Sequence, residues 1–245
     1  MPRIEVKSVT IYKGNEPLLD NISFTIPDAN LTLIIDADGD SETELVNLMG
    51  GILVPDEGAV FLDDVNLFEG TEEEVLNVRR NLSFVFQNGG LISNLSVLEN
   101  LLLPLNLYFP EKSRAEKIER IRHELNRFEL PDILEKRPAE LPRRLAKMIG
   151  FIRAIVIDPK VIIMDEPFAN CDVSIREKIF REIMRQKLAG TTLIAASSSS
   201  EAIFNVADWL ILLDDGKVIK TGEAQELVGL SSGPAHDIVK RYLGG

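Results

Sequence analysis

The sequence of 245 residues predicts an α/β fold with a mainly parallel β-sheet that helices cover on both faces. Strand-like and helix-like segments alternate in the last third of the chain, which is the order that a parallel sheet requires. Leu31–Ile35 is a continuous apolar run between turn-forming residues, as expected for a parallel strand buried on both sides. A chain of this length can bury a substantial core, so we expect one large domain over residues 1–245.

The first third of the chain is predicted to be rich in strands. Apolar and polar residues alternate over Ile4–Val9 and again over Ile22–Ile26, which ends before a proline. Val60–Leu62 and Leu82–Phe86 have the composition of further short strands. A helix-like run begins after residue 41 and continues through Leu45, Leu48 and Met49.

The middle of the chain is predicted to be helical. Over Lys112–Leu130, apolar residues recur at spacings of three and four, which gives one apolar stripe. Pro142 suits the first turn of a second helix. The last third then contains strands at Val161–Met164, Thr192–Ala196 and Leu210–Leu213, with an amphipathic helix at Ile175–Leu188.

Composition excludes several classes of function. The net charge of −12 argues against a nucleic-acid-binding protein and gives no broad attraction to anionic lipid. Cys171 is the only cysteine, which excludes an internal disulfide and fits a reducing cytoplasm. The sequence shows no signal-peptide pattern, and no apolar stretch reaches the length of a transmembrane helix. We therefore expect a cytoplasmic protein that a partner would have to hold at any membrane.

The most informative segment is residues 36–43, Asp-Ala-Asp-Gly-Asp-Ser-Glu-Thr. It lies between a predicted strand and a predicted helix, which is the setting of a phosphate-binding loop of pattern Gly-x-x-Gly-x-Gly-Lys-Ser/Thr. The positions that could still contact nucleotide are Asp36, Asp38, Gly39, Asp40, Ser41, Glu42 and Thr43. A glutamate stands where the lysine belongs, so repulsion of phosphate replaces an attraction of roughly 4 kcal/mol per unit charge at about 4 Å.

A second candidate site is the run Val161-Ile-Ile-Met-Asp-Glu-Pro. A buried strand here would deliver Asp165 to a magnesium-bound water, and Glu166 could polarise an attacking water. Alternatively, an apolar strand ending in Asp-Glu-Pro could simply cap a helix.

The order of these motifs over residues 3–243 resembles an ABC-transporter ATPase subunit. The resemblance implies that Tyr12 stacks on adenine, that Gln87 is the Q-loop glutamine, and that Phe168–Asp172 is the D-loop. Thr43, Gln87 and Asp165 would hold Mg²⁺ if Mg-nucleotide still binds. The run from Gln87 through Leu103-Pro-Leu is similar to the Mla-type ATPases of bacterial lipid trafficking.

The resemblance also implies an architecture and partners. We expect a RecA-like P-loop NTPase core, an N-terminal antiparallel β subdomain, and a helical subdomain inserted at about residues 88–154. The expected partners are an integral membrane permease, a lipid-carrier component and a small STAS-domain protein. The chain would form a head-to-tail dimer, either with a copy of itself or with an active relative, on the inner face of the cell membrane.

Three family elements that contact the γ-phosphate are replaced together. The loop lysine is Glu42, the signature Leu-Ser-Gly-Gly-Gln/Met reads Leu141-Pro142-Arg143-Arg144-Leu145, and the switch histidine is Ser198. Each composite site in the family's dimer needs one loop and one signature, so both contributions are damaged. We therefore predict a pseudo-ATPase that requires no cofactor and binds ATP and Mg²⁺ weakly. An active but atypical ATPase that uses Glu166 remains the alternative.

The two altered motifs carry opposite charge. In the family's dimer, the acidic loop would face Arg143 and Arg144, so the two surfaces could join without ATP because arginine pairs well with carboxylates. Neutral drift of an abandoned site is the alternative. Asp36-x-Asp38-x-Asp40 also opens like a calcium-binding loop, although its later positions do not match, so a soluble cation-binding dimeric scaffold stays open.

One further segment has two interpretations. Leu101–Phe109 is an apolar run that contains Pro104 and is followed by Pro110. The run could contact a permease, since the family places its coupling groove near the Q-loop, or it could pack inside the helical subdomain.

Overall fold

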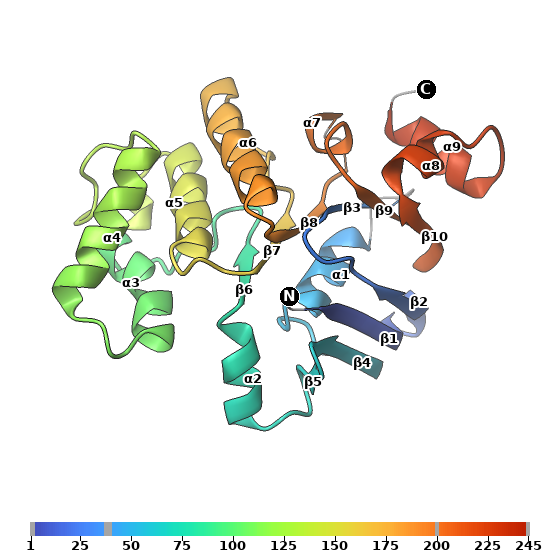
Figure 1. Cartoon of the computed structure of the whole chain (residues 1–245), viewed down its shortest axis with the longest axis horizontal. Coiled ribbons are helices and arrows are strands. Elements are labelled where there is room, and N and C mark those ends of the chain that lie inside the picture. The colour runs from blue at the N-terminus through green and yellow to red at the C-terminus, as the bar shows by residue number, and fades with distance from the viewer. Residues whose placement is uncertain (1–2, 37–40, 199–200, 244–245) are drawn as a thin grey trace.

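The computed structural model of the chain describes residues 3–36, 41–198 and 201–243. Two β-sheets form the framework, and helices pack between and beside them (Figure 1). The strands are β1 Ile4–Lys13, β2 Glu16–Thr25, β3 Leu31–Asp36, β4 Glu57–Leu62, β5 Val65–Asn66, β6 Leu82–Val85, β7 Val161–Asp165, β8 Thr192–Ala196, β9 Trp209–Asp214 and β10 Lys217–Glu223. The helices are α1 Glu42–Met49, α2 Glu72–Arg79, α3 Val97–Tyr108, α4 Arg114–Arg127, α5 Arg143–Ile155, α6 Val173–Leu188, α7 Glu201–Phe204, α8 Ala224–Val228 and α9 Pro234–Tyr242, with a 3₁₀ turn at Pro138–Glu140.

The larger sheet has the strand order β10-β9-β3-β8-β7-β6. All neighbours pair in parallel except β10, which pairs antiparallel with β9. Side chains of β3 alternate between two apolar clusters: Leu31, Leu33 and Ile35 face the α3–α6 side, whereas Ile34 faces α1 and the small sheet. Burial on both faces explains why the central strands are continuous apolar runs and confirms the predicted mainly parallel sheet.

The smaller sheet is antiparallel, with the order β2-β1-β4-β5. Its inner residues, including Ile4, Val6 and Val60, share one core with α1 and the large sheet. The predicted N-terminal antiparallel region is therefore present, although β1 and β2 extend well beyond the predicted strands Ile4–Val9 and Ile22–Ile26.

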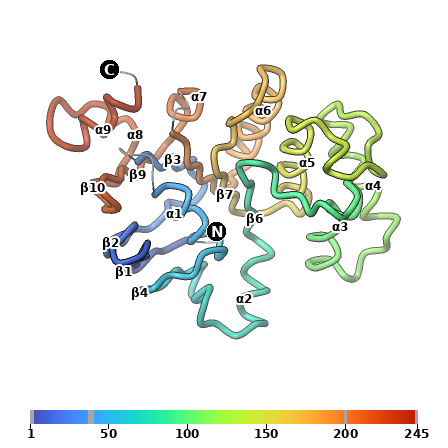
Figure 2. The backbone as a smooth tube through the Cα atoms, turned by 180° about the vertical axis from the view of Figure 1, so that it is seen from behind, coloured from blue at the N-terminus to red at the C-terminus, as the bar shows by residue number. Residues whose placement is uncertain are grey.

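Three helices, α3, α4 and α5, lie between β6 and β7 in the chain. Figures 1 and 2 show them gathered beside β6 and β7, across the large sheet from α8, α9 and β10. Two of them begin with a capping box, Ser96 with Glu99 in α3 and Ser113 with Glu116 in α4. Each box satisfies backbone N–H groups at the helix start, so local sequence fixes where these helices begin.

The leucines of the apolar run at residues 101–109 form one buried group and one exposed group. Leu101, Leu102 and Leu105 are buried in the core. Leu103 and Leu107 lie one turn apart on the outer side of α3, and 40% and 54% of their surface is exposed. The same helix therefore packs the core and presents an apolar face outward.

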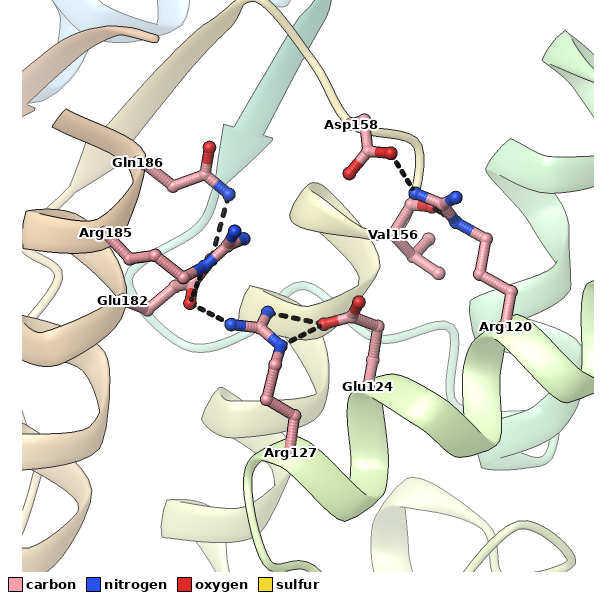
Figure 3. Close-up of polar contacts among 8 residues, drawn as sticks. All are labelled: Arg120, Glu124, Arg127, Val156, Asp158, Glu182, Arg185 and Gln186. Atoms are coloured by element: carbon pink, nitrogen blue, oxygen red, sulfur yellow. Dashed lines mark hydrogen bonds and ion pairs between the residues drawn. The ribbon is translucent and has the colours of Figure 1, made fainter. Parts of the chain in front are cut away.

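A network of charged side chains joins α4 to α6 (Figure 3). The Arg127 guanidinium lies between the carboxylates of Glu124 and Glu182 and forms ion pairs with both. Glu182, which is buried, also accepts hydrogen bonds from Arg185 at 2.7 and 2.9 Å and from Gln186 at 2.9 Å. The pKa of Glu182 is held below its ordinary value because these hydrogen bonds outweigh the effect of burial.

Within residues 3–36, 41–198 and 201–243, no helix is long and apolar enough to cross a membrane.

We expect Glu182→Ala to lower the free energy of unfolding by about 2 kcal/mol, because it leaves two arginines without their shared carboxylate. Both arginines are partly exposed, so water limits the cost. Urea denaturation at pH 7 measures the change, and Glu177→Ala on the exposed side of α6 is the matched control. A loss no larger than that of Glu177→Ala would show that the network does not stabilise the fold.

Candidate nucleotide site

The carboxyl ends of β3, β8 and β7 meet at one edge of the large sheet, because these three strands are parallel neighbours. This brings Asp36 and Asp165, the last residues of β3 and β7, close to Ser197 and Ser198 after β8. In open α/β sheets, ligands bind at such an edge. Three of the residues predicted to contact nucleotide, Asp36, Asp165 and Ser198, therefore lie together at this edge.

Asp36 is turned toward the start of α1. Its Oδ2 accepts hydrogen bonds from the backbone N–H of Ser41 at 2.8 Å and from the Ser41 hydroxyl at 2.7 Å. The carboxylate thus ties the end of β3 to the residue that precedes α1. Asp38, Gly39 and Asp40 lie outside the described residues.

Glu42, at the position of the family's lysine, is buried with only 5% of its surface exposed. Its Oε2 has no hydrogen-bond partner among the described residues. Burial raises the pKa of Glu42 to about 7; a backbone hydrogen bond opposes this, and the nearby carboxylates of Asp36, Glu166 and Asp165 add to it. The sequence led us to expect a fixed negative charge here, whereas the structure gives a carboxyl group that is partly neutral near pH 7.

Thr43 donates a hydrogen bond from its hydroxyl to Oδ1 of Asp165 at 3.1 Å. Burial raises the pKa of Asp165, and the Thr43 hydrogen bond works against that shift. The two side chains that would hold Mg²⁺ are therefore in contact with each other. A triphosphate at this edge would meet the buried carboxyl of Glu42 at the position where the family's loop pattern has a lysine, so this position offers it no positive charge.

Glu166, at the position of the catalytic glutamate, uses both carboxylate oxygens within the chain. Oε2 accepts a hydrogen bond from the Ser197 hydroxyl at 3.2 Å, and Oε1 accepts one from the backbone N–H of Ser198 at 2.6 Å. Ser198, at the switch-histidine position, thus contacts Glu166 through its backbone N–H. These bonds hold the Glu166 carboxylate against the segment that follows β8.

Lys147, in α5, was not predicted as a site residue. It is buried, and its Nζ donates to the carbonyl oxygens of Glu166 and Ala169, both at 2.7 Å. Burial lowers the pKa of Lys147, and nearby Cys171, Glu166 and Asp165 oppose the shift. Periodicity in the sequence does not single out Lys147, because α5 is buried on most sides and inward residues cannot be separated from outward ones.

Gln87 is exposed and lines a polar cavity of about 560 Å³ together with Glu166, Arg176 and Ser198. The loop that follows Gln87 packs tightly on α5. A Cβ atom on Gly150 would lie only 2.2 Å from the carbonyl oxygen of Gly89, so this contact requires glycine.

Tyr12 lies on β1 with 47% of its surface exposed. Its backbone N–H donates to Asp56 at 2.8 Å, and its hydroxyl lies 3.5 Å from Glu57. The negative charge of Glu57 is the largest cause that raises the pKa of Tyr12. No hydrogen bond within the described residues joins Tyr12 to Glu42 or Asp165.

The altered signature lies at the start of α5. Leu141 is buried, Leu145 is half-buried, and Pro142 occupies the N-cap position, one residue before the first turn where the sequence predicted it. Arg143 and Arg144 are exposed. The residues Leu141–Leu145 thus place two cations at the surface.

Arg144 already has a partner within the chain. Its Nε lies 3.7 Å from Oδ2 of Asp172, and both side chains are about half exposed. Oδ1 of Asp172 caps α6 by accepting from the backbone N–H of Ile175 at 2.9 Å. Asp172 therefore has a structural role in addition to any role in a dimer.

Within the described residues, no group of three or more His, Cys, Asp or Glu side chains is arranged to hold a metal ion. Two members of the calcium-like pattern, Asp38 and Asp40, fall outside those residues.

Residues 19–169 match the ABC transporter family profile, so the chain belongs to this family. The chain is 28% identical over 227 residues to the intermembrane phospholipid transport system ATP-binding protein MlaF of Escherichia coli K12, covering 91% of this chain and 83% of that protein. MlaF of Haemophilus influenzae is also 28% identical, with 92% and 85% covered.

Solved structures confirm the fold. A dimer of the ATP-binding cassette MJ0796, in a post-hydrolysis state bound to ADP and Pi, has a TM-score of 0.81 and 25% identity, with 90% of this chain and 98% of that chain covered. A nucleotide-free ATP-binding cassette from an ABC transporter has a TM-score of 0.78 and 26% identity, and both chains are fully covered. The predicted cassette fold and the predicted similarity to Mla-type ATPases are therefore confirmed.

We expect the stability of the protein to fall as pH rises through the pKa of Glu42. The folded-state pKa of about 7 lies above the ordinary 4.5, so folding favours the protonated form. The stabilisation is complete below about pH 4.5 and lost above about pH 7, with a maximum change of about 3 kcal/mol. Glu42→Gln should therefore be the more stable protein at pH 8 and nearly equal to the parent at pH 5.

Urea denaturation of both proteins between pH 5 and pH 8 measures this difference. Glu73→Gln, on an exposed part of α2, is the control. A Glu42→Gln variant that is less stable than the parent at pH 8 would show that Glu42 is ionised and compensated in the fold.

Proposed function

We propose that this chain is a degenerate nucleotide-binding subunit of an ABC transporter, which serves as a structural or regulatory partner and not as the motor. The observation that carries the proposal is the buried Glu42 carboxyl at the position of the phosphate-binding lysine. Lysine there would neutralise the β- and γ-phosphates, whereas a carboxyl group offers no positive charge in either protonation state. ATP and Mg²⁺ would then bind weakly, and no cofactor would be required.

The rest of the site supports the loss of hydrolysis. Glu166 would have to release the hydrogen bonds from Ser197 and Ser198 before it could polarise a water. Arg143 and Arg144 replace the signature glycines, which would otherwise let the start of α5 approach a phosphate closely. These features oppose the alternative of an atypical ATPase that uses Glu166.

The partner that the structure supports is an integral membrane permease. An apolar groove of about 510 Å³ lies between β6, α3 and α5, and Phe84, Leu103, Leu107 and Ala154 help to line it. Residues 88–154 would form the inserted helical subdomain, and residues 1–245 one nucleotide-binding domain. By analogy with the name of MlaF, the system would move lipid, with a STAS-domain protein and a lipid carrier as further partners on the inner face of the membrane.

We also propose that the chain dimerises without ATP through the acidic loop and Arg143 with Arg144. Asp36 and Glu42 are turned into the chain, so Asp38 and Asp40 would supply the acidic contacts. Arg144 would exchange its 3.7 Å contact with Asp172 for the partner's loop at little cost, because exposed ion pairs contribute about 0–1 kcal/mol. The partner would be a second copy or an active relative.

We expect the purified chain to release phosphate from ATP no faster than its Glu166→Gln variant, because the parent already lacks the positive charges that catalysis needs. A malachite-green assay measures the rates, with a competent homologue as positive control. Phosphate release that Glu166→Gln abolishes would contradict the proposal and would favour the atypical ATPase.

We expect the chain to be dimeric at low salt without nucleotide and to dissociate as salt rises, because ions screen the charge contacts. Size-exclusion chromatography at 50 mM and 1 M NaCl measures the state of the parent and of an Arg143→Glu/Arg144→Glu variant. Arg181→Glu, an exposed arginine on α6, is the matched control. A monomeric parent at low salt, or a double variant that dimerises equally well, would contradict this mode of assembly.

A further inference from the structure

The β7–α6 turn, residues 166–172, has an unfavourable backbone conformation. Glu166 and Asn170 have φ angles of 43° and 59°, in the left-handed region that residues with a Cβ atom rarely adopt. Inside the turn, the backbone N–H of Ala169 donates to the carbonyl oxygen of Glu166 at 3.1 Å, which is at the long end of the usual range. A turn of this kind persists only where the surrounding structure holds it.

Lys147, on α5, supplies contacts that hold this turn. Its Nζ donates to the carbonyl oxygens of Glu166 and Ala169, both at 2.7 Å. Only 3% of the surface of Lys147 is exposed, so water cannot readily replace these bonds. Hydrogen bonds from a charged donor are shorter and stronger than those between neutral groups. Two of the three N–H donors of the ammonium thus bind the backbone of the turn.

The positive charge of Lys147 also acts on the carboxylates beside the turn. Burial is the largest cause that raises the pKa of Asp165, and the ammonium of Lys147 opposes this shift. Glu166 and Asp165 in turn favour the charged form of Lys147. The residue is therefore a counter-charge at the acidic edge of the sheet as well as a hydrogen-bond donor.

The far end of the turn contacts α5 as well. Nε of Arg144 lies 3.7 Å from Oδ2 of Asp172, the last residue of the turn. Asp172 also caps α6 through its other oxygen. The turn is thus held on α5 at its start and middle by Lys147 and at its end by Arg144. The exposed charges at the start of α5 and at the end of the turn therefore belong to one connected unit.

We propose that Lys147 is a positioning residue for the dimer surface. Its buried ammonium holds the β7–α6 turn on α5, so that Arg143, Arg144 and Asp172 keep one geometry without nucleotide. An ordered surface loses less conformational entropy when it binds, so the second copy of the chain binds more tightly. This inference rests on the proposed dimerisation without ATP and adds the residue that prepares the surface.

Hydrogen exchange of the full chain, followed by mass spectrometry, tests whether Lys147 holds the turn. In Lys147→Met, the amides of residues 168–172 should exchange about tenfold faster or more, because two bonds from a charged donor are lost. Lys117→Met on α4 is the matched control, since Lys117 is also buried and its Nζ donates to Asn106 at 3.1 Å. This control should leave exchange in the turn unchanged.

Analytical ultracentrifugation at 50 mM NaCl without nucleotide measures the consequence for assembly. Lys147→Met should raise the dissociation constant of the dimer about tenfold, whereas Lys117→Met should leave it within about twofold of the parent. Because Lys147 is buried, lost contact between its side chain and the partner does not account for such a change. If Lys147→Met does not fold, Lys147→Gln, which keeps an N–H donor without the charge, should show the same changes to a smaller degree.

Three results would overturn the inference alone. The first is faster exchange throughout the Lys147→Met chain in step with a lower stability in urea, which would assign Lys147 to general stability of the fold. The second is unchanged exchange in the turn. The third is a looser turn with an unchanged dimer dissociation constant. A parent chain that is monomeric at 50 mM NaCl would instead overturn the proposed dimerisation, and this inference with it.

Discussion

Four carboxyl groups meet at one edge of the parallel sheet, and the way the fold accommodates them governs the rest of the site. Asp36 accepts two hydrogen bonds from Ser41, and Asp165 accepts one from Thr43. Glu166 accepts bonds from the segment after β8. Glu42 has no such partner for its Oε2 among the described residues and is instead held partly neutral by burial. Three of the carboxyl groups thus accept hydrogen bonds within the chain, and the fourth is only partly ionised near pH 7.

The cassette fold is retained although the charged groups at the candidate nucleotide site are altered. The strands and helices that would hold a nucleotide are in place, and solved ATP-binding cassettes superimpose on them with TM-scores near 0.8. Lys147 ties α5 to the turn after β7 through two carbonyl oxygens, and the Arg127 network ties α4 to α6. The helical segment is therefore joined to the sheet by contacts that do not depend on ATP, which is what a structural subunit needs.

Much of the fold could be predicted from the sequence because its signals are local. Continuous apolar runs identified β3, β7 and β8, and the apolar stripe of α4 identified a helix whose bounds differ from the prediction by a few residues. Motif order then gave the family. The edges of the small sheet were less predictable, because β1 and β2 continue through polar residues that pair across the hairpin.

The sequence indicated which residues belong to the candidate site, but it did not indicate their protonation states or their hydrogen bonds. The resemblance to the family assigned Glu42 and Asp165 to one nucleotide site, yet burial and neighbouring carboxylates, which depend on the tertiary fold, set the pKa of Glu42. Lys147 was not predicted as a site residue because α5 is buried on most sides, so periodicity does not single it out. Its role follows from the two carbonyl groups that the tertiary fold brings to it.

Isothermal titration calorimetry with Mg-ATP at pH 8, where Glu42 is mostly ionised, tests the central claim most directly. A competent homologue under the same conditions provides the reference signal. We expect no saturable heat up to millimolar Mg-ATP, because a carboxylate faces the position of the phosphates. A one-to-one isotherm with micromolar affinity would show that a triphosphate fits beside Glu42 and would contradict the loss of nucleotide-driven function.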